Sequence, residues 1–195
     1  EKLFLDVENP DLVIFGGDNT TLETEDEIYE SLAFVLEPII ERKIPWCYVY
    51  GNHDRAEISG EKQEVIYHSF DYCVSDDVSK LDGEATCCLP IYGCKSDDVK
   101  FAVWCIDSQD YTTEHSYDCV HTDQIDWYKA VSEKLETENG GKVNGLMIMH
   151  MPVIELRQCI LDMKGTGFHG TAMESSTPYN SVCCSELNYA WQSNI

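Results

Sequence analysis

Three short polar segments, each directly after an apolar run, carry the side chains of this sequence that could do chemistry. Asp18 follows the first run, Asn52 and His53 follow the second, and His150 follows the last. A carboxylate, a carboxamide oxygen and an imidazole nitrogen form a mixed donor set that suits divalent ions such as Mn, Fe, Zn or Mg. The residue types therefore suggest a metal site.

Each polar segment also has a purely structural explanation. Gly16-Gly17-Asp18-Asn19 and Gly51-Asn52 are both typical of turns. A single histidine such as His150 is more often a structural residue than a ligand. The metal hypothesis therefore depends on the three segments occupying equivalent places in the fold.

The apolar runs before these segments are predicted to be buried strands. Residues 11–15 and 46–50 read as strands, and apolar residues recur at helical spacing between them. Thr21 or Thr24 could cap that helix. Strand, helix and strand in this order predict a βαβ unit with a parallel pair. Because ligands of open α/β sheets bind beyond the carboxyl ends of the strands, we expect the polar segments to converge.

The second half of the chain continues this alternation less regularly. Residues 99–106 and 143–149 are predicted strands, and a predicted helix between them begins at Thr122 or Asp123. Residues 56–98 predict one short helix among short strands and loops. The simplest account is one α/β domain over residues 1–195.

Composition and charge narrow the classes of function. With 43% hydrophobic and 25% charged residues, the chain is predicted to fold rather than to be disordered. A formal net charge of −23 argues against binding of long nucleic acids, because an acidic surface repels their phosphates. The apolar runs are too short for a membrane span, so none is expected.

Motifs at the three strand ends resemble consecutive motifs of the calcineurin-like metallophosphoesterase superfamily. They are GGDNT at 16–20, GNHD at 51–54 and MHMP at 149–152, of which GNHD after an apolar strand is the most specific. The wider pattern is similar to the non-purple relatives of purple acid phosphatases, a branch that includes phosphatases acting on proteins. The supporting stretches are 9–20, 44–54, 106–111, 117–128 and 150–156.

This resemblance implies a fold and an enzyme class. The fold would be α/β and layered, an incomplete central β-sandwich flanked by helices. The enzyme would hydrolyse a phosphomonoester of a small molecule or a protein, with a metal-bound hydroxide at a dinuclear centre of Mn, Fe, Zn or Mg. Two rival readings remain open, a phosphodiesterase of the same superfamily and a non-catalytic binding or regulatory domain on the same scaffold.

The resemblance also implies a role for each motif residue. Asp18 would bridge two metal ions, and Asn52 and His150 would bind the second ion. His53 would contact the phosphate and protonate the leaving oxygen. Asp54 would hold the imidazole of His53 in its productive orientation.

Other residues are weaker candidates. Arg55 could bind a substrate phosphate or serve as a salt-bridge partner, and His169 could line the pocket or belong to an ordinary surface loop. Asp107 could support the site from its strand end. Gln124 is interpreted as helix packing, and His121 as a surface residue without motif context.

The sequence departs from the family pattern at both ends. It contains neither the Asp-x-His motif expected within residues 1–17 nor the Gly-His-x-His motif that should follow His150. We expect both motifs to lie outside an excerpt that by itself is inactive, although loss in a degenerate pseudo-enzyme is the alternative. Thr21 stands where purple acid phosphatases carry an iron-binding tyrosine, so a coloured iron centre is not expected.

Overall fold

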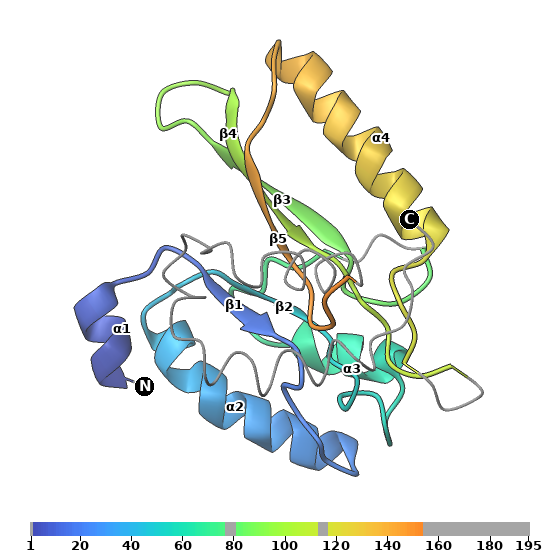
Figure 1. Cartoon of the computed structure of the whole chain (residues 1–195). Helices are drawn as coiled ribbons and strands as arrows, with labels where there is room; N and C mark the ends of the chain where they lie inside the picture. The colour runs from blue at the N-terminus through green and yellow to red at the C-terminus, as the bar shows by residue number, and fades with distance from the viewer. Residues whose placement is uncertain (1, 77–80, 113–116, 154–195) are drawn as a thin grey trace, which may run out of the picture.

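A computed structural model of the protein describes residues 2–76, 81–112 and 117–153. These residues form two β-sheets with helices around them (Figure 1). The strands are β1 (Val13–Gly16), β2 (Trp46–Val49), β3 (Cys87–Tyr92), β4 (Val99–Cys105) and β5 (Gly145–Ile148). The helices are α1 (Lys2–Glu8), α2 (Glu25–Glu41), α3 (Gly60–Tyr67) and α4 (Thr122–Asn139).

The first sheet is the predicted βαβ unit. Strands β1 and β2 pair in parallel, with Val13 opposite Trp46. Thr24 caps α2, because its hydroxyl accepts a hydrogen bond from the Glu27 amide. Acidic residues fill the first turn of this helix, where the helix dipole favours them. The predictions of a capped helix and a parallel pair are therefore confirmed.

Strand β2 lies between two hydrophobic cores because successive side chains point to opposite faces. Trp46, Tyr48 and Tyr50 belong to the core shared with α2 and α3. Cys47 and Val49 belong to a second core, built with residues of β3 and β4. The two sheets therefore pack against each other, and β2 is buried on both faces.

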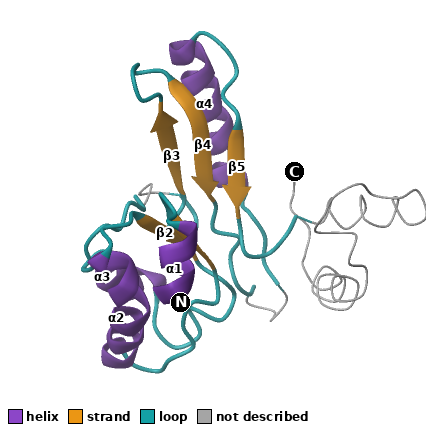
Figure 2. Cartoon of the chain, turned by 90° about the vertical axis from the view of Figure 1, so that its left-hand side faces the viewer, coloured by secondary structure: helices purple, strands orange, loops and turns teal. Residues whose placement is uncertain are grey.

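The second sheet has the order β3-β4-β5 and carries α4 on its other side. Strand β3 is antiparallel to β4, and β5 is parallel to β4. Trp104 of β4 meets the rings of Trp127 and Tyr128 of α4 at centroid distances of 5.9 Å and 4.7 Å. Figure 2 shows α4 along this sheet and the other helices around the first sheet. The predicted layered α/β fold with a central β-sandwich is confirmed.

Helix α1 was not foreseen, β3 was expected only as one of the unplaced short strands within residues 56–98, and one topological expectation is wrong. Helix α1 is seven residues long, buries only Leu5 and leaves Leu3, Phe4 and Val7 exposed, and so short a segment is not recognised as a helix by periodicity. Strand β3 contains Pro90, which argues against a strand. His150 follows β5 of the second sheet, whereas Asp18 follows the first. The polar segments therefore end strands of two packed sheets, not of one open sheet.

The helices also bear on the question of membranes. Within the described ranges, none is both long and apolar enough to cross a bilayer.

Candidate metal centre

The first and last polar segments meet where the two sheets come together. The imidazole Nε2 of His150 lies 3.3 Å from the Asp18 carboxylate oxygen Oδ2. The other ring nitrogen, Nδ1, lies 2.9 Å from the carbonyl oxygen of Gly16. A contact across 134 positions of sequence thus joins two residues that were predicted to act together.

The backbone contact determines that Nδ1 of the His150 ring carries a hydrogen. Only an N–H can donate to the Gly16 carbonyl, so Nδ1 carries a hydrogen and Nε2 of the neutral ring keeps its lone pair. That lone pair faces the Asp18 carboxylate, which is also an electron-pair donor. Two such donors at this distance need a cation between them, either a proton or a metal ion.

Close backbone approach makes this pairing possible. Gly17 has a φ of +93°, and a Cβ atom added there would lie 2.5 Å from Nδ1 of His150. Asp18 itself has a φ of +52°, in a region that aspartate tolerates better than most residues. The glycine preceding the carboxylate is therefore required by the histidine that the carboxylate faces, and the strained loop is typical of a functional site.

Asn52 is buried and has one side of its carboxamide fixed. Its Nδ2 donates to the Tyr111 hydroxyl at 2.7 Å, and the residue is 6% exposed. This contact leaves the carboxamide oxygen available as a ligand. Tyr111 lies in a stretch that supported the family resemblance, but its hydroxyl was not foreseen as a partner of Asn52.

Asp54 ties the loop after β1 to the turn after β2. One carboxylate oxygen accepts from the Thr20 amide at 2.8 Å, and the other accepts from the Gly51 amide at 2.7 Å. Burial raises the pKa of Asp54, and the amide hydrogen bonds from Gly51 and Thr20 oppose that shift. Among the described residues no hydrogen bond joins this carboxylate to the His53 imidazole, so its contacts are those of a residue that positions two loops.

His53 lies at the exposed tip of the same turn. Its backbone amide donates to Oδ1 of Asp18 at 3.1 Å, and its side chain is exposed. The amide contact places the turn beside the carboxylate that faces His150. The imidazole is therefore free to meet a molecule arriving from solvent.

Arg55, which was predicted to bind substrate or to form a salt bridge, has its guanidinium paired with carboxylates inside the protein. The side chain is 8% exposed and forms ion pairs with Glu84, Asp107 and Asp110. Burial alone would lower the pKa of Arg55, but the charge and hydrogen bonds of Asp107, with further help from Asp110 and Glu84, raise it. Arg55 is therefore a salt-bridge partner, the alternative prediction, although its ion pairs are buried rather than facing solvent.

Asp107 and Gln124 extend this buried network toward α4. Glu84 and Gln109 each donate a backbone hydrogen bond to the Asp107 carboxylate, at 2.9 Å. Gln124 is fully buried and donates to the Asp107 carbonyl at 2.8 Å. Asp107 thus holds Arg55, the residue that directly follows the GNHD turn. Gln124 is packed at the start of α4, as predicted. His169, the remaining predicted site residue, lies outside the described residues.

Asp18 and His150 lie together in the fold, and Asn52 belongs to the turn whose His53 amide binds Asp18. Their side chains fit a divalent ion. Asp18 offers a carboxylate oxygen, Asn52 a carboxamide oxygen and His150 an imidazole nitrogen with its lone pair free. This donor set suits borderline and hard divalent metals. The His150 proton is held on the far nitrogen by a backbone carbonyl, which is the usual second contact of a metal-binding histidine.

Comparison with known proteins gives consistent relatives. The family described as calcineurin-like phosphoesterase matches residues 1–165. The chain is 30% identical over 200 residues to "Probable inactive purple acid phosphatase 14" of Arabidopsis thaliana, covering 89% of this chain and 49% of that protein. It is 28% identical over 171 residues to "Probable inactive purple acid phosphatase 29" of the same plant, covering 76% and 43%.

A fungal relative is named as a phosphatase without the word inactive. The chain is 28% identical over 148 residues to "Phosphatase DCR2" of Saccharomyces cerevisiae, covering 68% of this chain and 26% of that protein. The chain therefore spans about half, or less, of the length of the curated relatives it matches. No solved structure matches it at a significant level.

Proposed function

The chain belongs to the calcineurin-like phosphoesterase family, and from this premise we propose that the complete protein is a metal-dependent phosphatase. It would hydrolyse a phosphomonoester of a small molecule or a protein. The observation that carries the proposal is the pairing of the His150 Nε2 lone pair with the Asp18 carboxylate at 3.3 Å. A divalent ion is the partner that both groups would share.

The chain's own residues would hold the ions of a dinuclear centre. Asp18 would bridge the two ions, and Asn52 and His150 would bind the second. When bound, such ions make water a stronger nucleophile near neutral pH and offset the charge of phosphate oxygens. That offset matters here, because the chain's net charge of −23 would otherwise repel an anionic substrate.

His53 would act on the substrate rather than on the metal. Its exposed imidazole stands on the turn whose backbone amide binds Asp18. From that position it would contact the phosphate and deliver a proton to the leaving oxygen. Asp54 would serve as a positioning residue, since its carboxylate joins the Asp18 loop to this turn.

The proposal is tested with the full-length protein and an aryl phosphate in the presence of Mn²⁺. We expect hydrolysis that EDTA abolishes and added Mn²⁺ restores. His53→Ala should lower kcat/KM by about a hundredfold, within the range for loss of a general acid. His68→Ala is a matched control, because His68 is exposed and its ring pairs with Glu64 on α3.

Two results would overturn the mechanism. Hydrolysis that continues unchanged in EDTA would show that the mechanism does not need a metal ion. Equal rates for His53→Ala and His68→Ala would remove His53 from the chemistry.

A second candidate function is supported by the names of two relatives. Both Arabidopsis proteins are called probable inactive phosphatases, so the scaffold could bind phosphorylated molecules or regulate a partner without turnover. This candidate predicts Mn²⁺-dependent binding of inorganic phosphate by the full-length protein with no hydrolysis of any phosphate ester. Detectable turnover that depends on His53 would exclude it.

A third candidate, a phosphodiesterase, differs only in substrate. A comparison of aryl monoester with bis-aryl diester turnover by the same preparation separates the two enzymes. A preference for the diester would replace the phosphomonoesterase proposal and leave the metal residues unchanged.

A further inference from the structure

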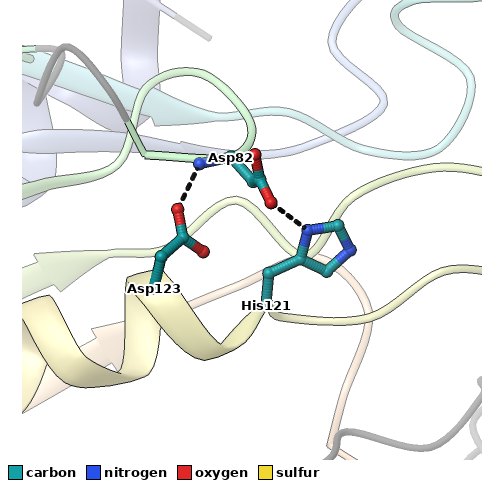
Figure 3. A group of neighbouring side chains, drawn as sticks. All are labelled: Asp82, His121 and Asp123. Carbon is teal, nitrogen blue, oxygen red and sulfur yellow. Dashed lines mark hydrogen bonds and ion pairs between the residues drawn. The ribbon is translucent and has the colours of Figure 1, made fainter.

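A second group of metal-binding side chains lies at the start of α4. Figure 3 shows Asp82 from the loop before β3 facing His121 and Asp123. Nδ1 of His121 is 2.9 Å from Oδ2 of Asp82, and the Asp82 amide donates to Oδ2 of Asp123 at 2.6 Å. One ligand atom from each of the three residues lies within 4.8 Å of the others.

One oxygen in this group is buried without a partner. Oδ1 of Asp123 has almost no accessible surface and accepts no hydrogen bond from the described residues. A buried carboxylate oxygen left unsatisfied is costly, so it calls for a hydrogen-bond donor such as water or for a cation. Its position in a group that already contains an imidazole and a second carboxylate points to a cation.

A fourth residue prepares the histidine for such a role. Nε2 of His121 lies 3.2 Å from Oδ1 of Asp118. A carboxylate at one ring nitrogen holds the hydrogen there and leaves a lone pair on the other nitrogen, which is the arrangement of many metal-binding histidines. Here the other nitrogen is Nδ1, and it faces Asp82.

The local charge also favours a cation. Asp82, Asp118 and Asp123 bring three carboxylates to one imidazole. Even a protonated His121 would leave an excess of two negative charges. None of the ion pairs formed by the lysines and arginines of the described ranges reaches these three aspartates.

The group is accessible and its backbone is held in place. It lines an open pocket of about 430 Å³ together with Cys119, Val120 and Thr122. Next to Asp82, Gly83 has a φ of +82°, and a Cβ atom there would lie 2.5 Å from the Asp107 carboxylate. This tight contact fixes the loop that presents Asp82, so the pocket has a defined wall.

We propose that Asp82, His121 and Asp123 form a second metal site, separate from Asp18, Asn52 and His150, that binds a divalent transition ion such as Zn²⁺. One imidazole nitrogen and two carboxylate oxygens are a donor set that zinc accepts. Mg²⁺ is a poorer fit, because it prefers oxygen ligands in octahedral geometry.

The ion would clamp two segments that are distant in sequence. Asp82 belongs to the loop before β3, and Asp123 belongs to the first turn of α4. Gln124, the next residue of α4, binds the Asp107 carbonyl, and the Asp107 carboxylate binds Arg55 behind the GNHD turn. A bound ion would therefore stabilise the Gln124–Asp107–Arg55 contacts beside the first metal centre, and it would not contact the substrate.

The test counts zinc in the full-length protein. The background variant Asp18→Asn/His150→Ala removes the first centre, and the protein is stripped with EDTA, loaded with Zn²⁺ at about pH 8 and dialysed. This pH limits competition from protons at the histidine. Elemental analysis should find one zinc per chain more in this background than after Asp82→Asn or His121→Ala is added to it. Bound Zn²⁺, but not Mg²⁺, should raise the thermal midpoint by a few degrees.

Two controls separate loss of zinc from loss of folding. Asp82 is 68% exposed, so Asp82→Asn should leave folding intact, which circular dichroism checks. Asp126→Asn removes an exposed carboxylate from the same helix outside the group, and it should retain the zinc. Zinc retained by Asp82→Asn, or no zinc in the background variant, would overturn the proposal. Neither readout is enzymatic, so both are independent of the proposed phosphatase activity.

Discussion

The two histidine sites of this molecule are built in opposite ways. His150 is held by a backbone carbonyl, and its other nitrogen faces one carboxylate. Both nitrogens of His121 face carboxylate side chains, those of Asp82 and Asp118. Partial burial would lower the pKa of His121, but its hydrogen bonds to these two aspartates and their charge raise it.

This difference explains why only one site was visible in the sequence. The proposed ligands of the first centre follow strands directly, and glycines beside them mark where backbones approach. The ligands of the second group come from a loop and a helix start, where aspartate and histidine are common for other reasons. Ligands that follow strands in glycine-containing turns leave a recognisable motif, whereas ligands drawn from a loop and a helix start do not.

The largest expected effect concerns the buried ion pair of Arg55 and Asp107, which lies between the two histidine sites in the chain of contacts described above. Arg55→Ala should lower the free energy of unfolding by about 3–5 kcal/mol, because it leaves the fully buried Asp107 carboxylate without its cation. Urea unfolding of the full-length protein measures this change. Arg42→Ala, which breaks a pair with the exposed Asp6, should cost less than about 1 kcal/mol.

The same pair of variants also tests whether Arg55 stabilises the fold or binds substrate. If the guanidinium bound substrate phosphate instead, Arg55→Ala would raise KM while leaving stability close to wild type. That result would restore the original prediction.

The next effect separates the two histidines by function. His150→Ala should lower kcat/KM by at least about a hundredfold, since it removes a proposed ligand of the reacting metal centre. His121→Ala should cost at most about tenfold, because His121 supports the site only through Gln124 and Asp107. Equal losses in aryl phosphate hydrolysis would erase the distinction between the two sites.

A pair of adjacent glycines tests whether backbone approach holds the first centre. Gly17→Ala should weaken Mn²⁺ binding about tenfold, because its Cβ would meet the His150 ring and its φ is positive. Gly16→Ala should have little effect, since nothing lies within 4 Å of a Cβ there. Calorimetric titration with Mn²⁺ compares them, and similar affinities would contradict the backbone explanation.

The smallest expected effect concerns Asp82 of the second group in the absence of metal. In EDTA, Asp82→Asn should change the free energy of unfolding by less than about 1 kcal/mol, because an exposed ion pair contributes little. A larger loss without metal, measured by urea unfolding, would mean that the aspartate stabilises the fold by itself.

Elements with strong local signals were predicted correctly. Helix α2 has both an apolar stripe and a capping threonine, and β2 is an uninterrupted apolar run. Helix α1 is only seven residues long and β3 contains a proline, so the bounds of these two elements could not be placed from the sequence. Burial of these two elements depends on segments distant in sequence, which periodicity does not reveal.

The sequence was sufficient to name the motif residues, but not to assign their partners. Asp54 was predicted to orient His53, yet its carboxylate binds the Thr20 and Gly51 amides. Arg55 has the residue type of a phosphate binder, yet three carboxylates surround it. Which group meets a charged side chain depends on folding geometry rather than on the residues beside it.

Local sequence by itself determined that polar groups follow apolar strands, because strand burial and turn chemistry act over a few residues. Only the tertiary structure decided that Asp18 and His150 meet across two packed sheets, and that Asp82 reaches His121. Those contacts arise when hydrophobic faces of separate sheets and helices are buried together. Such long-range burial brings these side chains to 3.3 Å and 2.9 Å from each other without leaving any trace in their spacing along the chain.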